Sequence, residues 1–295
     1  QNNNLDFKKS LIISDFLNNF EINPSIYLSV SSFKINDIKK LENYLELLIP
    51  KSDRKVNGAF FTPNFIIDFI ISEVSPQSKD KCLDPSCGCG AFLIGLVEYF
   101  KKTFKKSVKS IIKENIFGAD ILNYNVTRSK IILSLYGLIN DEIIEESDFN
   151  ISTQDSLRAE WENEFNIIVG NPPYVKYQDL NDENRDYLIK NWKTIETGTF
   201  NLYFAFFELA YNLLTANGKL GYITPNNYFT SLAGLSLRQF FLQNKCLTRI
   251  LDFRHKKVFD AQTYTAITFA NKNNNESILF DNIHDTQNCK EFLLS

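Results

Sequence analysis

The feature that most constrains the fold is a strand-like segment followed by a glycine loop and an apolar helix. Residues 81–84 have the pattern of a buried strand ending in an acid, residues 85–90 contain two glycines, and residues 91–100 are apolar at helical spacing. This order is typical of the first unit of a nucleotide-binding βαβ fold, in which glycines let a ligand approach the backbone. The loop matches neither GxxxxGK[ST] nor GxGxxG, the phosphate-binding signatures. It therefore favours a cofactor with an adenosine but no pyrophosphate.

Acidic residues follow three successive strand-like segments. Asp84 ends the first, Asp120 ends residues 116–120, and Asp155 follows residues 151–154. The carboxyl ends of parallel strands meet at one edge of a sheet, where open α/β sheets bind their ligands. A carboxylate there can accept hydrogen bonds from ribose hydroxyls or an adenine amine. A helix N-cap or a solvated turn explains any single acid better, but three in succession favour a binding site.

A second motif, Asn171-Pro172-Pro173-Tyr174, follows Gly170 and the strand-like residues 165–169. The prolines lack backbone donors and fix φ, so the loop is stiff and its carbonyls are free to accept hydrogen bonds. Asn171 adds a side-chain carbonyl and Tyr174 an aromatic face. Such groups suit a planar ring with an exocyclic amine, for example a nucleobase held out of its stack. Taken alone, these four residues fit a proline-stiffened turn with a core tyrosine equally well.

The order of three motifs resembles that of the γ group of N6-adenine DNA methyltransferases from bacterial restriction–modification systems. The motifs are Gly-Ala-Phe-Phe-Thr-Pro at 58–63, Asp-Pro-Ser-Cys-Gly-Cys-Gly-Ala-Phe-Leu at 84–93, and Asn-Pro-Pro-Tyr. Residues 198–203 and 218–225 also look like later motifs of that family, so the resemblance covers roughly residues 57–270. It implies a doubly wound, mostly parallel, seven-stranded Rossmann-like α/β sheet, with the strand at 265–270 antiparallel. It also implies S-adenosylmethionine as the cofactor.

The resemblance assigns roles to individual residues. Asn171 and the Pro172 carbonyl would accept hydrogen bonds from the target N6 amine within a motif completed by Pro173, while Tyr174 and Phe259 would stack on the flipped base. The implied cofactor-binding residues lie in the three motifs and at the strand ends: Phe61, Thr62, Pro63, Asp84, Ser86, Gly88, Gly90, Asp120, Ile121, Asp155, Ser156 and Asn171.

Two of these assignments have structural alternatives. Thr62 and Pro63 also fit a helix start, with Thr62 as the N-cap and Pro63 as the first helical residue. Phe259 is one of 26 phenylalanines, most of which must belong to the core.

The chemistry implied by these residues is catalysis by positioning. The lone pair of an adenine amine is delocalised into the ring, and two acceptors on its N–H bonds would aim that lone pair at the methyl group without a covalent intermediate. Methylation at C5 of cytosine would instead need a cysteine nucleophile, and in the C5-cytosine methyltransferases this cysteine follows a proline. None of the five cysteines follows a proline. No metal is expected, because Cys87 and Cys89 have only His255 and His284 as imidazole partners and lack zinc-site spacing.

Charge and hydropathy limit the partners. The net charge of −3 opposes binding to phosphates, although residues 254–257 (Arg-His-Lys-Lys) place positive charge just before Phe259. We expect double-stranded DNA and a restriction endonuclease domain or subunit as partners. No apolar run reaches the roughly 18 residues of a membrane span and no signal peptide opens the sequence, which favours a cytoplasmic protein without membrane contact.

The expected organisation has three parts. Residues 1–55 are expected to form a helical segment with helices near 8–20 and 37–49, and residues 56–275 to form the methyltransferase domain. Residues 276–295 would be the start of a truncated target-recognition region, so the chain would be a catalytic fragment. The Lys-rich residues 101–113 are expected to lengthen the first helix of the domain, and the polar residues 176–198 to form a mobile loop near the substrate. Two other functions stay open: methylation of rRNA or a protein glutamine, and a non-catalytic DNA-binding scaffold subunit.

Overall fold

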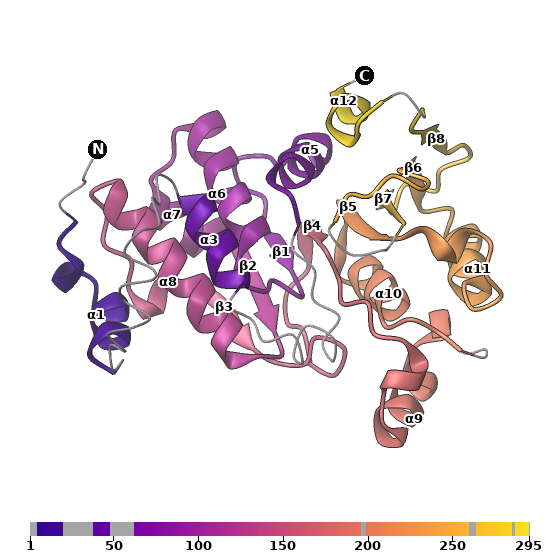
Figure 1. Ribbon diagram of the computed structural model, residues 1–295, viewed down its shortest axis with the longest axis horizontal. Helices are drawn as coiled ribbons and strands as arrows, with labels where there is room; N and C mark the ends of the chain where they lie inside the picture. The colour runs from indigo at the N-terminus through magenta and orange to yellow at the C-terminus, as the bar shows by residue number, and fades with distance from the viewer. Residues whose placement is uncertain are drawn as a thin grey trace.

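The computed structural model describes residues 5–19, 38–47, 62–195, 199–259, 264–284 and 287–294 (Figure 1). Its centre is an eight-stranded sheet with the order β3-β2-β1-β4-β5-β7-β6-β8. The strands are β1 (Cys82–Asp84), β2 (Ile116–Asp120), β3 (Asn150–Thr153), β4 (Phe165–Gly170), β5 (Leu214–Pro225), β6 (Leu247–Asp252), β7 (Thr265–Asn271) and β8 (Leu279–Asn282).

The sheet is mostly parallel. All pairs from β3 to β5 are parallel, β7 is antiparallel to both β5 and β6, and β8 is parallel to β6. The predicted doubly wound α/β sheet is thus confirmed, together with its antiparallel strand. The predicted number of seven strands was one too few, because β8 adds to the edge beside β6.

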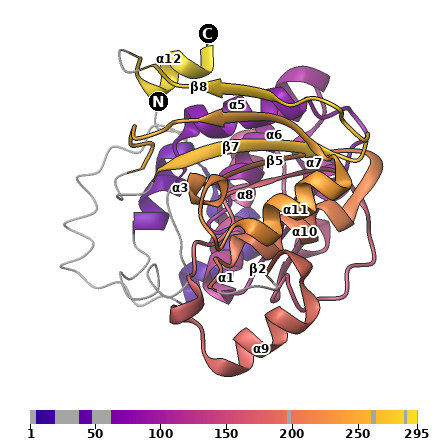
Figure 2. The same ribbon diagram turned by 90° about the vertical axis from the view of Figure 1, so that its right-hand side faces the viewer.

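Helices cover both faces of the sheet (Figures 1 and 2). Along β4, Ile167 and Val169 belong to a hydrophobic cluster with α5, α6, α7 and α8, whereas Ile168 points into a second cluster with α10 and α11. Two further helices near the N-terminus, α1 and α3, pack on α8. The helices are α1 (Leu11–Asn18), α3 (Ile38–Leu47), α5 (Asn64–Val74), α6 (Ala91–Phe104), α7 (Val108–Asn115), α8 (Asn123–Ile139), α9 (Asp182–Asn191), α10 (Tyr203–Leu213), α11 (Leu235–Asn244) and α12 (Cys289–Leu294).

The Lys-rich segment does not lengthen the first helix of the domain. Helix α6 ends at Phe104, where Lys105 adopts a left-handed conformation with φ of 57°. A new helix, α7, begins after Ser107, whose Oγ accepts a hydrogen bond from the backbone N–H of Ser110. The expectation failed because a single left-handed residue and an N-cap interrupt an otherwise helical composition.

Most of residues 177–195 are helical rather than a loop, and Lys176 forms a β-bridge with Asn201. A 3₁₀ turn (Tyr177–Asp179), helix α9 and a second 3₁₀ turn (Lys193–Ile195) follow one another, while residues 196–198 lie outside the described part of the chain. The Asn181 side chain caps α9 by accepting from the Asn184 N–H at 2.8 Å, and acids in the first turn complement the helix dipole. The polar composition reflects one exposed helix face, because Leu188 on the other face is buried.

Candidate cofactor and base-binding site

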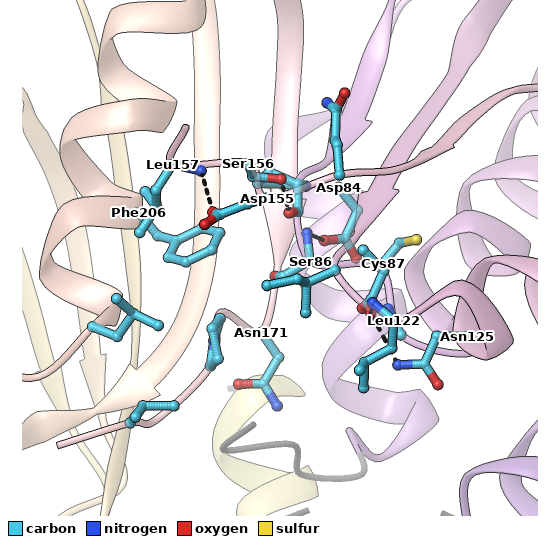
Figure 3. Close-up of a pocket in the computed structure, with 18 of the residues that line it drawn as sticks. Asp84, Ser86, Cys87, Leu122, Asn125, Asp155, Ser156, Leu157, Asn171 and Phe206 are labelled. Atoms are coloured by element: carbon cyan, nitrogen blue, oxygen red, sulfur yellow. Dashed lines mark hydrogen bonds between the residues drawn. The ribbon is translucent and has the colours of Figure 1, made fainter. Parts of the chain in front are cut away.

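A cavity of about 410 Å³ lies at the carboxyl ends of the central strands (Figure 3). Its walls come from the glycine loop, the residues after β2, β3 and β4, and helices α9 and α10. Ten of the predicted site residues line it: Thr62, Asp84, Ser86, Gly88, Asp120, Ile121, Asp155, Ser156, Asn171 and Pro173. Five others do not: Pro63, Gly90, Pro172, Tyr174 and Phe259. Phe61 lies outside the described residues.

The glycine loop is fixed by Asp120. Its carboxylate accepts hydrogen bonds from the backbone N–H groups of Gly88 and Leu122, both at 2.9 Å, and from Asn125 Nδ2 at 3.1 Å. Gly88 has a positive φ of 53°, a conformation that favours glycine. Burial raises the pKa of Asp120, and the three hydrogen bonds oppose that shift. Asp120 therefore shapes the loop, and few of its roughly four acceptor positions are left for a ribose.

Among the acids that line the cavity, Asp84 has the most strongly raised pKa. It is buried, and its Oδ1 accepts from the Ser86 N–H at 3.0 Å. Burial raises the pKa of Asp84 to about 8; the Ser86 hydrogen bond opposes the shift and the charge of Asp120 adds to it. A Cβ on Gly170 would come within 2.8 Å of Asp84 Oδ1, so the close approach of β4 to this carboxyl group requires a glycine.

Asp155 is more exposed and is held from two sides. Its Oδ1 accepts from the Leu157 N–H at 3.0 Å (Figure 3), and its Oδ2 lies 3.3 Å from Arg158 Nε. The neighbouring Ser156 hydroxyl donates to the Pro85 carbonyl at 2.6 Å, which joins this loop to the glycine loop. The loops after β1 and β3 thus form one connected rim.

Asn171 connects the second motif to the region before α5. Its Nδ2 donates to Thr62 Oγ1 at 3.0 Å, and its Oδ1 accepts from the Tyr174 hydroxyl at 2.5 Å. The alternative that Thr62 caps a helix is wrong, because α5 begins at Asn64 with Pro63 at the N-cap position. The extended ψ of 138° at Pro63 moves the helix start past Thr62, whose hydroxyl accepts from Asn171 instead.

The two predicted stacking residues contact each other. The ring centroids of Tyr174 and Phe259 are 6.5 Å apart with an angle of 59° between the ring planes. Phe259 is only 6% exposed, and burial raises the pKa of Tyr174. A base stacked between the two rings would need them parallel and further apart, so this pair is not arranged as a sandwich here.

The cavity also contains residues that the sequence analysis missed. They come from the end of the β3 loop and from the helices that form the outer wall, and they include Leu157, Arg158, Asn181, Asn184, Leu188 and Phe206. A signal for this wall was present in the sequence, because Asn181-Asp182-Glu183 has the pattern of a helix start.

The family model for the Eco57I restriction-modification methylase matches residues 25–259. This chain belongs to that family. The prediction drawn from the order of the motifs is therefore confirmed at the level of restriction–modification methylases.

Curated relatives of this Eco57I-family chain carry related names. It is 26% identical over 340 residues to the type II restriction enzyme and methyltransferase RM.Eco57I of Escherichia coli, covering 94% of this chain and 33% of that protein. It is 30% identical over 250 residues to the type II methyltransferase M.BanIII of Aneurinibacillus aneurinilyticus, covering 79% and 41%. The chain thus spans well under half the length of these two relatives.

Solved structures share the fold of this Eco57I-family chain. A DrdV–DNA complex matches with a TM-score of 0.69 at 16% identity, covering 96% of this chain and 35% of that one. The M protein of the type I restriction enzyme EcoKI matches with a TM-score of 0.61 at 19% identity, covering 82% and 53%. Across the described ranges, no helix is long and apolar enough to cross a membrane, and no three His, Cys, Asp or Glu residues are grouped to hold a metal ion.

Proposed function

We propose that this chain transfers a methyl group from S-adenosylmethionine to N6 of an adenine flipped out of DNA. The observation that carries the proposal is the position of Asn171, which lines the same cavity as the glycine loop and the three strand-end acids. A group that binds an exocyclic amine and a pocket that suits an adenosine cofactor thereby meet at one edge of the sheet. Family membership supports DNA as the substrate class.

The cavity suits S-adenosylmethionine in shape and charge. Gly88 and Gly90, both with positive φ, bring backbone rather than side chains to the loop after β1. The buried Asp84 carboxyl group is expected near the methionine part of the cofactor, which carries its positive charges, Asp120 near the ribose, and Asp155 near the adenine amine. Burial opposes charge on Asp84, and a cationic ligand beside it would favour the ionised form.

The chain's own residues would position the target amine. Bound S-adenosylmethionine would supply an electrophilic methyl group. The Asn171 carbonyl oxygen accepts from the Tyr174 hydroxyl, and we propose that it also accepts from an N–H of the target. Thr62 holds the other end of the same amide, so its orientation does not depend on the substrate. With the Pro172 carbonyl as a second acceptor, the lone pair of the amine would point at the methyl group.

DNA contacts would come in part from residues 254–257, next to Phe259. Because the net charge is −3, we expect the chain alone to bind DNA weakly. We propose that it acts with a target-recognition region and, as the name of RM.Eco57I indicates for that relative, alongside a restriction enzyme.

The test is to identify the methylated atom. DNA would be incubated with the full-length protein and labelled S-adenosylmethionine, digested to nucleosides and analysed by mass spectrometry. We expect label in N6-methyladenine, and none when Asn171 is replaced by alanine. Label in a methylated cytosine, or no transfer to DNA at all, would overturn the proposal.

A further inference from the structure

Helix α9 forms a wall of the cavity although it belongs to none of the motifs described above. Asn184 and Leu188 on α9, and its N-cap Asn181, line the cavity. Asp155, the expected partner of the cofactor's adenine, also lines the cavity, and Arg158 contacts both Asp155 and Asn184. We infer that Arg158 is a positioning residue that latches α9 onto Asp155, so that cofactor binding and the docking of α9 stabilise each other. This inference rests on the proposed function.

The guanidinium of Arg158 makes three contacts at once. Its Nε lies 3.3 Å from Asp155 Oδ2, a terminal nitrogen donates to Asn184 Oδ1 at 2.7 Å, and its carbon lies 4.0 Å from the centre of the Tyr187 ring. Tyr187 in turn donates its hydroxyl to the Leu157 carbonyl at 3.2 Å. The contacts with Asn184 and Tyr187 therefore join α9 to the loop after β3, while the contact with Asp155 lies within that loop. A guanidinium suits such a junction because its planar fork can donate to Asp155 and Asn184 while its flat face lies against the Tyr187 ring, and an ammonium group has no such face.

A second arginine ties α9 to the Asn-Pro-Pro-Tyr side of the cavity. Arg185 Nε donates to the Tyr177 carbonyl at 2.9 Å, a terminal nitrogen donates to the Gln178 carbonyl at 3.2 Å, and the guanidinium lies 4.6 Å from the Tyr177 ring centre. Tyr177 comes three residues after Tyr174. Helix α9 thus connects the loop that carries Asn171 with the acid expected to bind the cofactor.

The ion pair alone contributes little stability. The side chains of Arg158 and Asp155 are 34% and 36% exposed, and such pairs are weakened by solvent. Arg158 acts on the binding of the ligand by orienting the Asp155 carboxylate. The Leu157 N–H contacts one of its oxygens and Arg158 contacts the other. A ligand that binds this oriented carboxylate stabilises the docked helix, and by reciprocity the docked helix strengthens binding of the ligand.

The test is hydrogen exchange of the α9 amides in the full-length protein, with and without saturating S-adenosylhomocysteine. The variants are Arg158→Ala, Arg158→Lys and Asn184→Ala. The matched control is Arg249→Ala. Arg249 lies on β6, pairs with Glu73 and Asp281, and does not line the cavity. Calorimetry on the same samples gives the affinity for the ligand.

We expect the ligand to slow exchange of α9 in the wild type and in Arg249→Ala. Arg158→Ala should speed exchange of α9 without ligand, weaken binding roughly three- to tenfold, and lose the ligand-dependent protection. Asn184→Ala removes one of the contacts between Arg158 and α9, so it should lose part of the protection and weaken binding less than Arg158→Ala does. Arg158→Lys keeps a positive charge beside Asp155 but loses the planar contacts with Asn184 and Tyr187, so it should recover affinity and protection together and only in part, whereas Arg249→Ala should change neither.

Different outcomes overturn different claims. If the wild type binds neither S-adenosylmethionine nor S-adenosylhomocysteine, the proposed function fails. If the wild type binds the ligand but Arg158→Ala matches Arg249→Ala in affinity and in α9 protection, only the role of Arg158 in coupling α9 to ligand binding is refuted. Without any ligand, equal α9 exchange in these two variants also overturns the latch.

Discussion

The glycine loop after β1 and the Asn-Pro-Pro-Tyr loop after β4 lie at the same edge of the sheet but are held in different ways. In the first, backbone N–H groups of the loop donate to the neighbouring Asp84 and to Asp120 at the end of the adjacent strand β2. The second depends on side chains from distant parts of the chain, with Thr62 holding Asn171 and Tyr174 resting against Phe259. Under the proposed function, the glycine loop would bind the cofactor without rearranging, whereas Tyr174 and Phe259 would have to move apart before a base could enter between their rings.

The largest effect should come from Asn171→Ala, which changes the Asn-Pro-Pro-Tyr loop and leaves the glycine loop intact. Removal of an acceptor used in the transition state should lower kcat by about 10²–10³-fold. Affinity for S-adenosylhomocysteine, measured by calorimetry, should fall much less than kcat, because the other predicted cofactor-binding residues remain. The comparison variant is Thr62→Ala, which removes the hydrogen bond that holds the Asn171 amide and should lower kcat less than Asn171→Ala does. Full activity of Asn171→Ala would refute the assignment of methyl transfer to this loop.

The aromatic pair should show a smaller effect that depends on the substrate. Stacking contributes about 1–3 kcal/mol per base, so Tyr174→Ala should lower kcat/KM by roughly 5–150-fold on duplex DNA. The loss should be smaller when the target adenine is already unpaired, because less energy is needed to flip it. Steady-state rates on matched and mismatched duplexes measure this difference.

Phe259 needs a different substitution, because it is buried. Phe259→Leu keeps an apolar side chain in the core and removes only the aromatic face. We expect its thermal unfolding to stay close to that of the wild type while its activity falls as in Tyr174→Ala. A variant that loses stability but not activity per folded molecule would make Phe259 a core residue only.

The affinity of the proposed cofactor site for S-adenosylmethionine should depend on pH. The pKa of Asp84 is raised to about 8, so this group is mostly protonated at pH 7 when no ligand is bound. A cationic ligand prefers the ionised form, so affinity for S-adenosylmethionine should rise by up to about tenfold per pH unit and level off above pH 8. Calorimetry in two buffers of different ionisation enthalpy should detect proton release. Asp84→Asn should weaken binding and remove the pH dependence, and an unchanged pH profile would contradict the role of Asp84.

The smallest effect concerns stability. A folded-state pKa above the unfolded value of 3.8 means that the folded protein binds the proton more tightly. The free energy of unfolding contributed by Asp84 is therefore greatest below pH 3.8 and is lost as the pH rises towards 8. Asp84→Asn stays neutral, so it should raise stability at pH 8 by roughly 0.5–2 kcal/mol, seen as a higher Tm. Asp155→Asn, at a more exposed position, is the control and should not show this gain.

What could be predicted from the sequence was local in origin. The positions of β1, β2 and β4, the glycine loop and the acids at the strand ends follow from apolar runs, glycines and prolines within about ten residues. The antiparallel β7 and the family followed from the order of motifs. These features depend on short segments whose conformation is set by their own side chains.

The tertiary structure alone decided which residues of these segments form hydrogen bonds with one another. Thr62 contacts Asn171 rather than capping α5, Asp120 accepts from Gly88 in the glycine loop, and Asn184 of α9 accepts from Arg158 at the cavity wall. In each case the partners are far apart in the sequence, and a buried donor or acceptor must find whichever partner the fold brings near. A local pattern specifies that a group can form a hydrogen bond, but only the packed sheet specifies with which residue.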